Sequence, residues 1–138
     1  MKRFLIIIVL ALVPLAGVAG SRKDSVPKET ISRLINEYNS HDGFELVRIF
    51  RIAVAEYEDC DANVRDRFNE KVAKALENSE LLMEVKDEED MVRIYGTITE
   101  DGDKIKDCVI FIPEDYTLVC IFRTIPMKAL MKLAGEFD

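Results

Sequence analysis

The sequence contains little of the chemistry that most enzymes and metalloproteins use. Its 138 residues include one histidine, His41, and three scattered cysteines. A general base needs a nucleophile or a second acid close by, and neither is visible around His41, which we interpret as a solvated residue at a helix end. The cysteines lack the paired spacing of zinc ligands. We therefore predict no metal site and no cofactor.

Common enzyme motifs are absent as well. The chain has no G-x-S-x-G elbow, no glycine loop for phosphate and no H-E-x-x-H helix. Three acidic runs, at residues 56–61, 87–90 and 100–103, lack the alternating acids and the final glutamate of a calcium loop. We interpret them as turns and solvated surface. The sequence therefore predicts no catalytic residues, although an unusual small enzyme stays an alternative.

Long apolar runs are rare, and the longest stands at the N-terminus. Lys2 and Arg3 precede an unbroken apolar stretch over residues 4–13, and Pro14 and small residues then lead to Ser21. This is the order of a secretory signal peptide, whereas an uncleaved membrane anchor is the alternative. We predict a signal peptide at 1–20, a linker at 21–25 and a single domain at 26–138.

Charge of positive sign is also scarce. The chain has 19 basic and 26 acidic residues, a formal net charge of −7, and loss of Lys2 and Arg3 with the signal makes the rest more acidic. Such a body does not suit nucleic acid or anionic lipid. We expect an exported protein, periplasmic or secreted, from a Gram-negative bacterium, with no stable membrane span after cleavage.

Hydrophobic periodicity predicts an α+β fold. We expect an antiparallel sheet of four to five strands, with a C-terminal meander and two to three packed helices. The predicted elements are a helix at 26–40, a strand at 44–55, a helix at 62–78, strands at 81–86, 91–98, 105–112 and 117–123, and a last helix capped by Thr124.

Three turns set the expected register of the meander. Asp101-Gly102 is typical of a two-residue hairpin and pairs Ile98 with Ile105. A turn at 88–89 and a three-residue loop after Ile112 complete the meander. One face then becomes the predicted core: Leu81, Met83, Val85, Val92, Ile94, Ile98, Ile105, Val109, Phe111, Val119 and Ile121.

The same register leaves an apolar group on the opposite face. This candidate partner surface consists of Ile110, Ile112, Tyr116, Leu118 and Phe122. Large apolar patches mark contact sites, so either the helix at 26–40 covers this one or a partner or second copy does. A second copy would pair along strand 117–123 if that strand is a sheet edge.

The predicted register also places Cys108 directly opposite Cys120. Cross-strand cysteines at such a position are close enough for a disulfide, and export permits oxidation. Two buried thiols that act as small apolar side chains are the alternative. Cys60, in the acidic run at 56–61, has no predicted partner.

The stretch LMEVKDEEDMVRIYGTITEDGDKIKDCVIFI, residues 82–112, resembles small exported bacterial proteins of the family catalogued as domain of unknown function 4252. The shared features are the LMEVKD and VRIY strands, the EDGDKIK turn and the apolar strands after it. A helix with the Ile31, Leu34 and Ile35 spacing before a strand is similar too. The resemblance implies an exported α+β protein and carries over no catalytic residue.

Together these features favour an exported, non-catalytic protein that binds an envelope or extracellular protein partner. Two other classes stay open. One is a small-ligand carrier with a pocket lined by Tyr95, Tyr116 and Phe122, and the other is a small enzyme with a site between sheet and helices. An enclosed cavity would favour these two classes, and a flat apolar patch would favour the partner.

The N-terminal pattern predicts that the protein is cleaved near Ala19 or Gly20 and released in soluble form. N-terminal sequencing of envelope material from the producing cell should therefore begin near Gly20 or Ser21. Recovery of intact Met1-Lys2 in the membrane fraction would contradict this prediction.

Overall fold

The structure, a computed structural model, describes residues 25–129 and 131. Its elements are α1 (Lys28–Tyr38), β1 (Glu45–Ile49), β2 (Ile52–Glu56), α2 (Ala62–Leu76), β3 (Leu81–Asp87), β4 (Asp90–Ile98), β5 (Lys104–Ile112), the 3₁₀ turn η2 (Pro113–Asp115) and β6 (Thr117–Pro126). The predicted signal peptide and residues 21–24 of the predicted linker lie outside the described residues.

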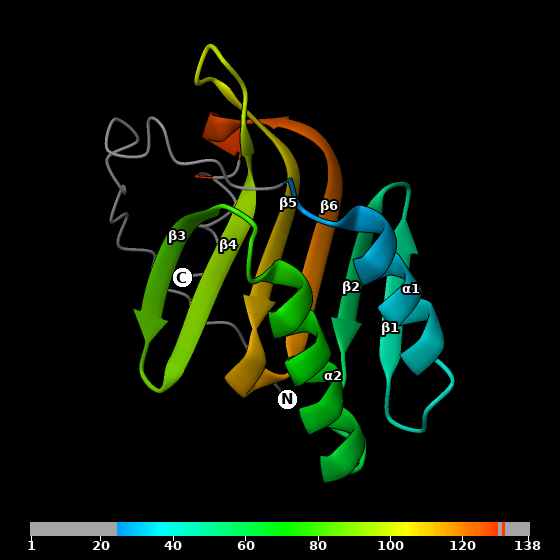
Figure 1. The fold of residues 1–138 in the computed structure, drawn as a ribbon. Helices are drawn as coiled ribbons and strands as arrows, with labels where there is room; N and C mark the ends of the chain where they lie inside the picture. The colour runs from blue at the N-terminus through cyan, green and yellow to red at the C-terminus, as the bar shows by residue number, and fades with distance from the viewer. Residues whose placement is uncertain (1–24, 130, 132–138) are drawn as a thin grey trace.

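One antiparallel sheet of six strands forms the body, in the order β1-β2-β6-β5-β4-β3 (Figure 1). The predicted α+β fold is confirmed, but the expected four to five strands become six. The reason is that residues 44–55 form a hairpin, β1 and β2, which turns at Phe50 and Arg51. Phe50 has a φ of 54°, a left-handed conformation that the sequence does not announce. The sheet order also makes β6 a central strand, so strand 117–123 is not an edge along which a second copy could pair.

Both long helices lie on the same face of the sheet, and α1 contacts α2 (Figure 1). The apolar spacing of the helix at 26–40 gives α1 one buried side, on which Ile31, Ile35 and Tyr38 lie. The helix begins at Lys28, after Pro27, rather than at residue 26. None of the helices within the described residues is sufficiently long and apolar to cross a membrane.

The predicted last helix begins later than expected. Thr124 pairs with Lys106 within β6 instead of capping a helix. Helical residues start at 127, after Pro126 ends the strand. Met127 contacts buried side chains of the sheet, and residues 130 and 132–138 of the predicted helix lie outside the described residues.

The sheet is apolar on both faces. On the helical face, the strands contribute Ala55, Val109, Phe111, Leu118 and Cys120 to a cluster that includes Ile31, Ile35, Tyr38, Phe68, Val72 and Leu76 of the helices. The reverse face carries a second cluster of Met83, Val85, Val92, Ile94, Ile105, Cys108, Ile110, Ile112 and Ile121. The predicted core face is therefore divided, because its Val109 and Phe111 belong to the helical face and most of its other members to the reverse face.

A β-bulge explains how the strands serve both faces. Ile98 pairs with Ile105 as predicted, but Tyr95 pairs with Val109, so Asp107 and Cys108 together oppose Gly96. Asp107 takes a φ of 58°, which aspartate tolerates better than most residues. The extra residue inverts the side-chain alternation of β5. Consequently Val109 faces the helices, while Ile105 and Ile110 face the reverse side.

This inversion overturns the predicted partner surface. Ile110 and Ile112 are buried on the reverse face, whereas Leu118, Tyr116 and Phe122 belong to the helical face. The five side chains do not form one exposed patch. For the three on the helical face, the alternative of an intramolecular cover by the helix at 26–40 is the correct one, because the α1 stripe belongs to the same cluster.

Gly96 is required at the bulge because a Cβ there would stand 2.8 Å from Cγ2 of Ile105 and 3.2 Å from Cδ1 of Leu82. We expect Gly96→Ala to lower the free energy of unfolding by about 1–3 kcal/mol. Urea denaturation followed by circular dichroism measures the change.

Gly102→Asn is the matched control. Gly102 lies in open space at a φ of 78°, which asparagine tolerates, so its substitution should change stability much less. Equal midpoints for Gly96→Ala and the parent chain would contradict the steric explanation.

Candidate functional site

The most exposed apolar side chains of the described residues gather on the β1–β2 hairpin. Val47 is 57% exposed, Ile49 is 59% exposed and Phe50 is 94% exposed. Val47 and Ile49 alternate with Leu46, which packs against the helical cluster, so both project on the reverse face of the sheet. Among residues 25–129 and 131, β1 pairs with β2 alone, so within the described part of the chain this surface borders an unpaired sheet edge.

Backbone hydrogen bonds identify which groups of β1 point to that edge. The amide of Tyr57 donates to the carbonyl of Tyr116, and the amide of Phe122 donates to the carbonyl of Arg51. The odd-numbered residues of β2 therefore bond to β6, and its even-numbered residues bond to β1. By the same alternation Leu46 and Arg48 direct their N–H and C=O groups away from the sheet, along the free edge.

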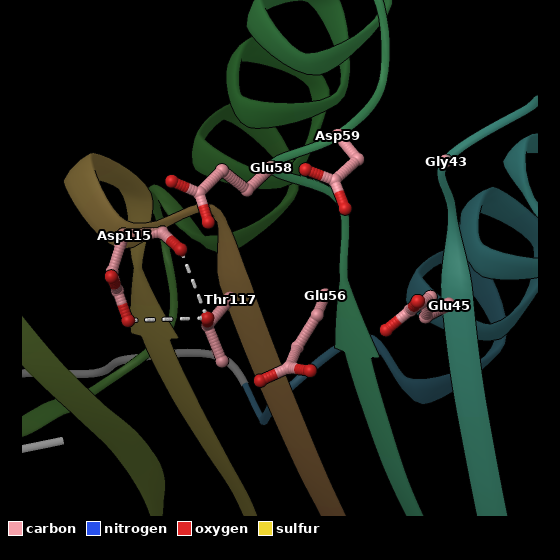
Figure 2. Close-up of a pocket in the computed structure, with 7 residues that line it drawn as sticks. All are labelled: Gly43, Glu45, Glu56, Glu58, Asp59, Asp115 and Thr117. Atoms are coloured by element: carbon pink, nitrogen blue, oxygen red, sulfur yellow. Dashed lines mark hydrogen bonds between the residues drawn. The ribbon is translucent and has the colours of Figure 1, made fainter. Parts of the chain in front are cut away.

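An acidic pocket of about 320 Å³ lies beside the start of β1. Figure 2 shows its residues converging from the ends of β1, β2 and β6 and from the loops after β2 and β5. Its lining consists of Gly43, Glu45, Glu56, Glu58, Asp59, Asp115 and Thr117. The acidic run at 56–61, predicted to be solvated surface, thus joins carboxylates that are distant in the sequence.

Close backbone packing fixes one wall of the acidic pocket. Gly43 has a φ of 90°, and a Cβ there would stand 2.4 Å from the carbonyl oxygen of Asp59. Only glycine allows this approach. On the opposite wall, the hydroxyl of Thr117 donates to the backbone carbonyl of Asp115 at 3.0 Å (Figure 2).

A buried tyrosine holds the elements around the acidic pocket together. The hydroxyl of Tyr57 donates to Oδ1 of Asn69 at 2.5 Å, and Nδ2 of Asn69 donates to the carbonyl of Pro113 at 3.0 Å. These two bonds join the end of β2, helix α2 and the turn η2. Burial raises the pKa of Tyr57 far above its ordinary value, so the phenol stays a neutral donor.

The chemistry of the acidic pocket is that of an anionic surface. Carboxylates attract ammonium or guanidinium groups, but no histidine lines the pocket; His41 is exposed and lies with its ring 5.3 Å from that of Tyr38. Among the described residues, no group of three or more His, Cys, Asp or Glu side chains is arranged to hold a metal ion. The lining carboxylates therefore offer recognition of positive charge.

The opposite end of the hairpin is basic. Phe50, Arg51 and Arg123 line an open hollow at the turn between β1 and β2. Arg123 extends β6 on the same face as Thr117, at the other end of the strand. The reverse face of β1 and β2 thus runs from an acidic end, through Val47 and Ile49, to a basic end.

Sequence reasoning missed most of this site. The carrier hypothesis placed Tyr95, Tyr116 and Phe122 in a pocket, but all three pack against the helical cluster and line neither the acidic pocket nor the basic hollow. The guanidinium of Arg65 lies 4.5 Å from the centre of the Tyr116 ring. The alternation of Val47 and Ile49 with Leu46 and Arg48 indicates a strand, but no residue type indicates the turn at Phe50 and Arg51.

The predicted cysteine pair is not formed. Cys108 pairs with Ile121 and Cys120 pairs with Val109, because the loop after Ile112 is one residue longer than expected. The two side chains belong to opposite faces of the sheet, and all three thiols are free and buried.

Burial raises the pKa of Cys108 and that of Cys120 to about 12. Burial and then the carboxylates of Asp61 and Asp59 raise the pKa of Cys60.

Comparison with known proteins gives one match. Residues 35–138 match the sequence model of the family described as Domain of unknown function (DUF4252). This confirms the resemblance inferred from the hairpin motif. No curated protein and no solved structure matches the chain.

We expect all three cysteines to be reduced and protected. Because the thiolate is the reactive form, Cys108 and Cys120 should alkylate in the folded protein at pH 8 roughly 100-fold more slowly than in urea. Intact mass after alkylation in urea without reductant should show three modifications. A mass two hydrogens lower, with only one modified thiol, would contradict the free-thiol arrangement.

Proposed function

The chain belongs to this family, and within it we propose that the protein is an exported, non-catalytic binding protein whose β1 edge receives an extended segment of a protein partner. The observation that carries the proposal is the coincidence of a free strand edge with exposed apolar side chains. Strand addition uses such an edge, since main-chain bonds supply affinity and the side chains along the strand supply specificity.

Contrast with the other edge of the sheet supports this choice. β3 has an irregularity between Leu81 and Met83, and its exposed side chains include Glu84 and Lys86. Bulges and charges are the usual protection of an edge strand against unwanted pairing. The pairing of β1 with β2 has no irregularity, and the exposed Val47 and Ile49 occupy the centre and end of its reverse face, with Glu45 at its start.

The two alternative functions have less support. The space between sheet and helices is filled by large buried side chains, including Tyr57, Phe68 and Phe111. Neither the acidic pocket nor the basic hollow lies in that space. A carrier or an enzyme with a site between sheet and helices would need a cavity there.

Export to the periplasm or the medium is part of the proposal. Its support is the basic start and apolar run of residues 2–13 and the acidic composition of the rest. A protein partner in the same compartment would bind the hairpin through an extended segment, which belongs either to a folded or to an unfolded part of that partner.

A photoreactive amino acid at position 50 tests the proposal in the envelope of the producing cell. Phe50 is almost fully exposed, so its replacement should leave the fold intact and should yield crosslinked protein adducts on illumination. The matched control carries the same group at position 86, an exposed site on β3.

A second change, Ile49→Lys, should remove most of the adduct formed at position 50. It should change the free energy of unfolding by only about 0.5 kcal/mol, because Ile49 is more than half exposed. Equal adduct yields at positions 50 and 86, or a yield that Ile49→Lys leaves unchanged, would refute binding at the β1 edge.

A further inference from the structure

We infer that the segment received by β1 is the β1 strand of a second copy of this chain, which runs antiparallel to the first. This inference rests on the proposed function, because it names the occupant of the same edge. A two-fold axis normal to the sheet would join the two copies and would continue the reverse face of one into that of the other.

The direction of the outward backbone groups limits the register. Only Leu46 and Arg48 point their N–H and C=O groups to the free edge, so these two residues must exchange bonds with the second copy. If Leu46 of one copy opposes Arg48 of the other, both outward residues of each strand are used. A shift by one pair would place Arg48 of one chain opposite Arg48 of the second copy. Like charges directly opposite each other are unfavourable.

In this register Val47 lies on the two-fold axis and faces Val47 of the second copy. Val47 is 57% exposed and Ile49 is 59% exposed in the single chain. Val54 and Ile52 stand beside them on β2, as their direct partners. Pairing of the two edges would bring the two Val47 side chains into cross-strand contact and would join the apolar surfaces of the two hairpins into one.

Charge complementarity favours the same arrangement. With Val47 on the axis, Arg51 of one copy opposes Gly43 of the other, at the lip of the acidic pocket. Glu45 of that pocket then opposes Ile49 of the second copy, beside its Phe50–Arg51 turn, and Glu56 lies one strand further away. The basic end of each hairpin therefore meets the acidic end of the other, twice per dimer. A parallel arrangement would instead place acid beside acid and base beside base.

An unrelated basic peptide would also find an anionic end on this edge, but it would leave the basic hollow without a counterpart. A second copy satisfies both ends with the same contact. For this reason the two-fold pairing uses more of the observed surface than a partner that is only basic.

Sedimentation velocity and light scattering test the inference on the full-length sequence, expressed with its own leader and purified from the exported fraction. The parent chain should sediment as a dimer at micromolar concentration. Val47→Lys would bring two ammonium groups together at the axis and should weaken the dimer at least roughly tenfold. Arg51→Glu should also weaken it roughly tenfold, since the introduced carboxylate would face the acidic pocket of the second copy.

Exchange of the charges at positions 45 and 51 distinguishes a second copy from an unrelated partner. Glu45→Arg alone should weaken the dimer, whereas Glu45→Arg together with Arg51→Glu should dimerise more tightly than Arg51→Glu alone. Glu45 and Arg51 are exposed, so in dilute solution, where every chain is monomeric, these charge variants should keep the unfolding midpoint of the parent chain. Lys86→Glu on β3 makes the same change in charge as Arg51→Glu, and it should leave the dimer intact.

A parent chain that stays monomeric up to about 100 µM would overturn the inference. So would a dimer that Val47→Lys leaves unchanged, or a charge exchange that gains nothing over Arg51→Glu. In each case, adducts from position 50 to a different protein would show that the β1 edge still binds a partner, so failure of the dimer and failure of the proposed function are distinguishable.

Discussion

The arrangement of this protein depends on Tyr57, where β2 ends. Its ring contacts Phe68 of α2 with centroids 4.6 Å apart, and its hydroxyl bonds to Asn69 one residue further along that helix. Its amide is bonded to Tyr116, which fixes the end of β2 against the start of β6. A fully buried phenol needs a polar partner, and Asn69 meets this need while also holding Pro113. Helix, sheet and turn are therefore positioned by one side chain.

Local patterns were sufficient to predict the elements whose turns follow common rules. Ile98 pairs with Ile105 as expected, and the turn at 88–89 sets Glu84 opposite Arg93, and the two form an ion pair at 2.8 Å. The bulge at Asp107 could not be predicted in the same way. Its left-handed residue is an aspartate inside a continuous strand pattern. Gly96, an isolated glycine within a strand, is a signal of a bulge, but it does not indicate which residue of the facing strand is the extra one. A single extra residue then exchanged the two faces for every later side chain of β5.

The candidate site was predicted even less well, for two physical reasons. The β1–β2 turn uses Phe50 at a positive φ, whereas two-residue hairpins are usually signalled by glycine, asparagine or aspartate. The acidic pocket, in turn, combines Glu45 and Asp115 with the run after β2. These residues are far apart in the sequence and meet only because β6 lies beside β2. Composition announces an acidic protein, but only the strand order shows where the acids converge.

The unlike edges of the sheet also govern how far association can extend. If two copies join through β1, the combined sheet is bounded at both ends by β3. There the irregularity after Leu81 and the charges of Glu84 and Lys86 discourage any further strand from joining. Growth would stop at a closed pair, and the chain would avoid the open-ended stacking that leads exposed strands into fibres.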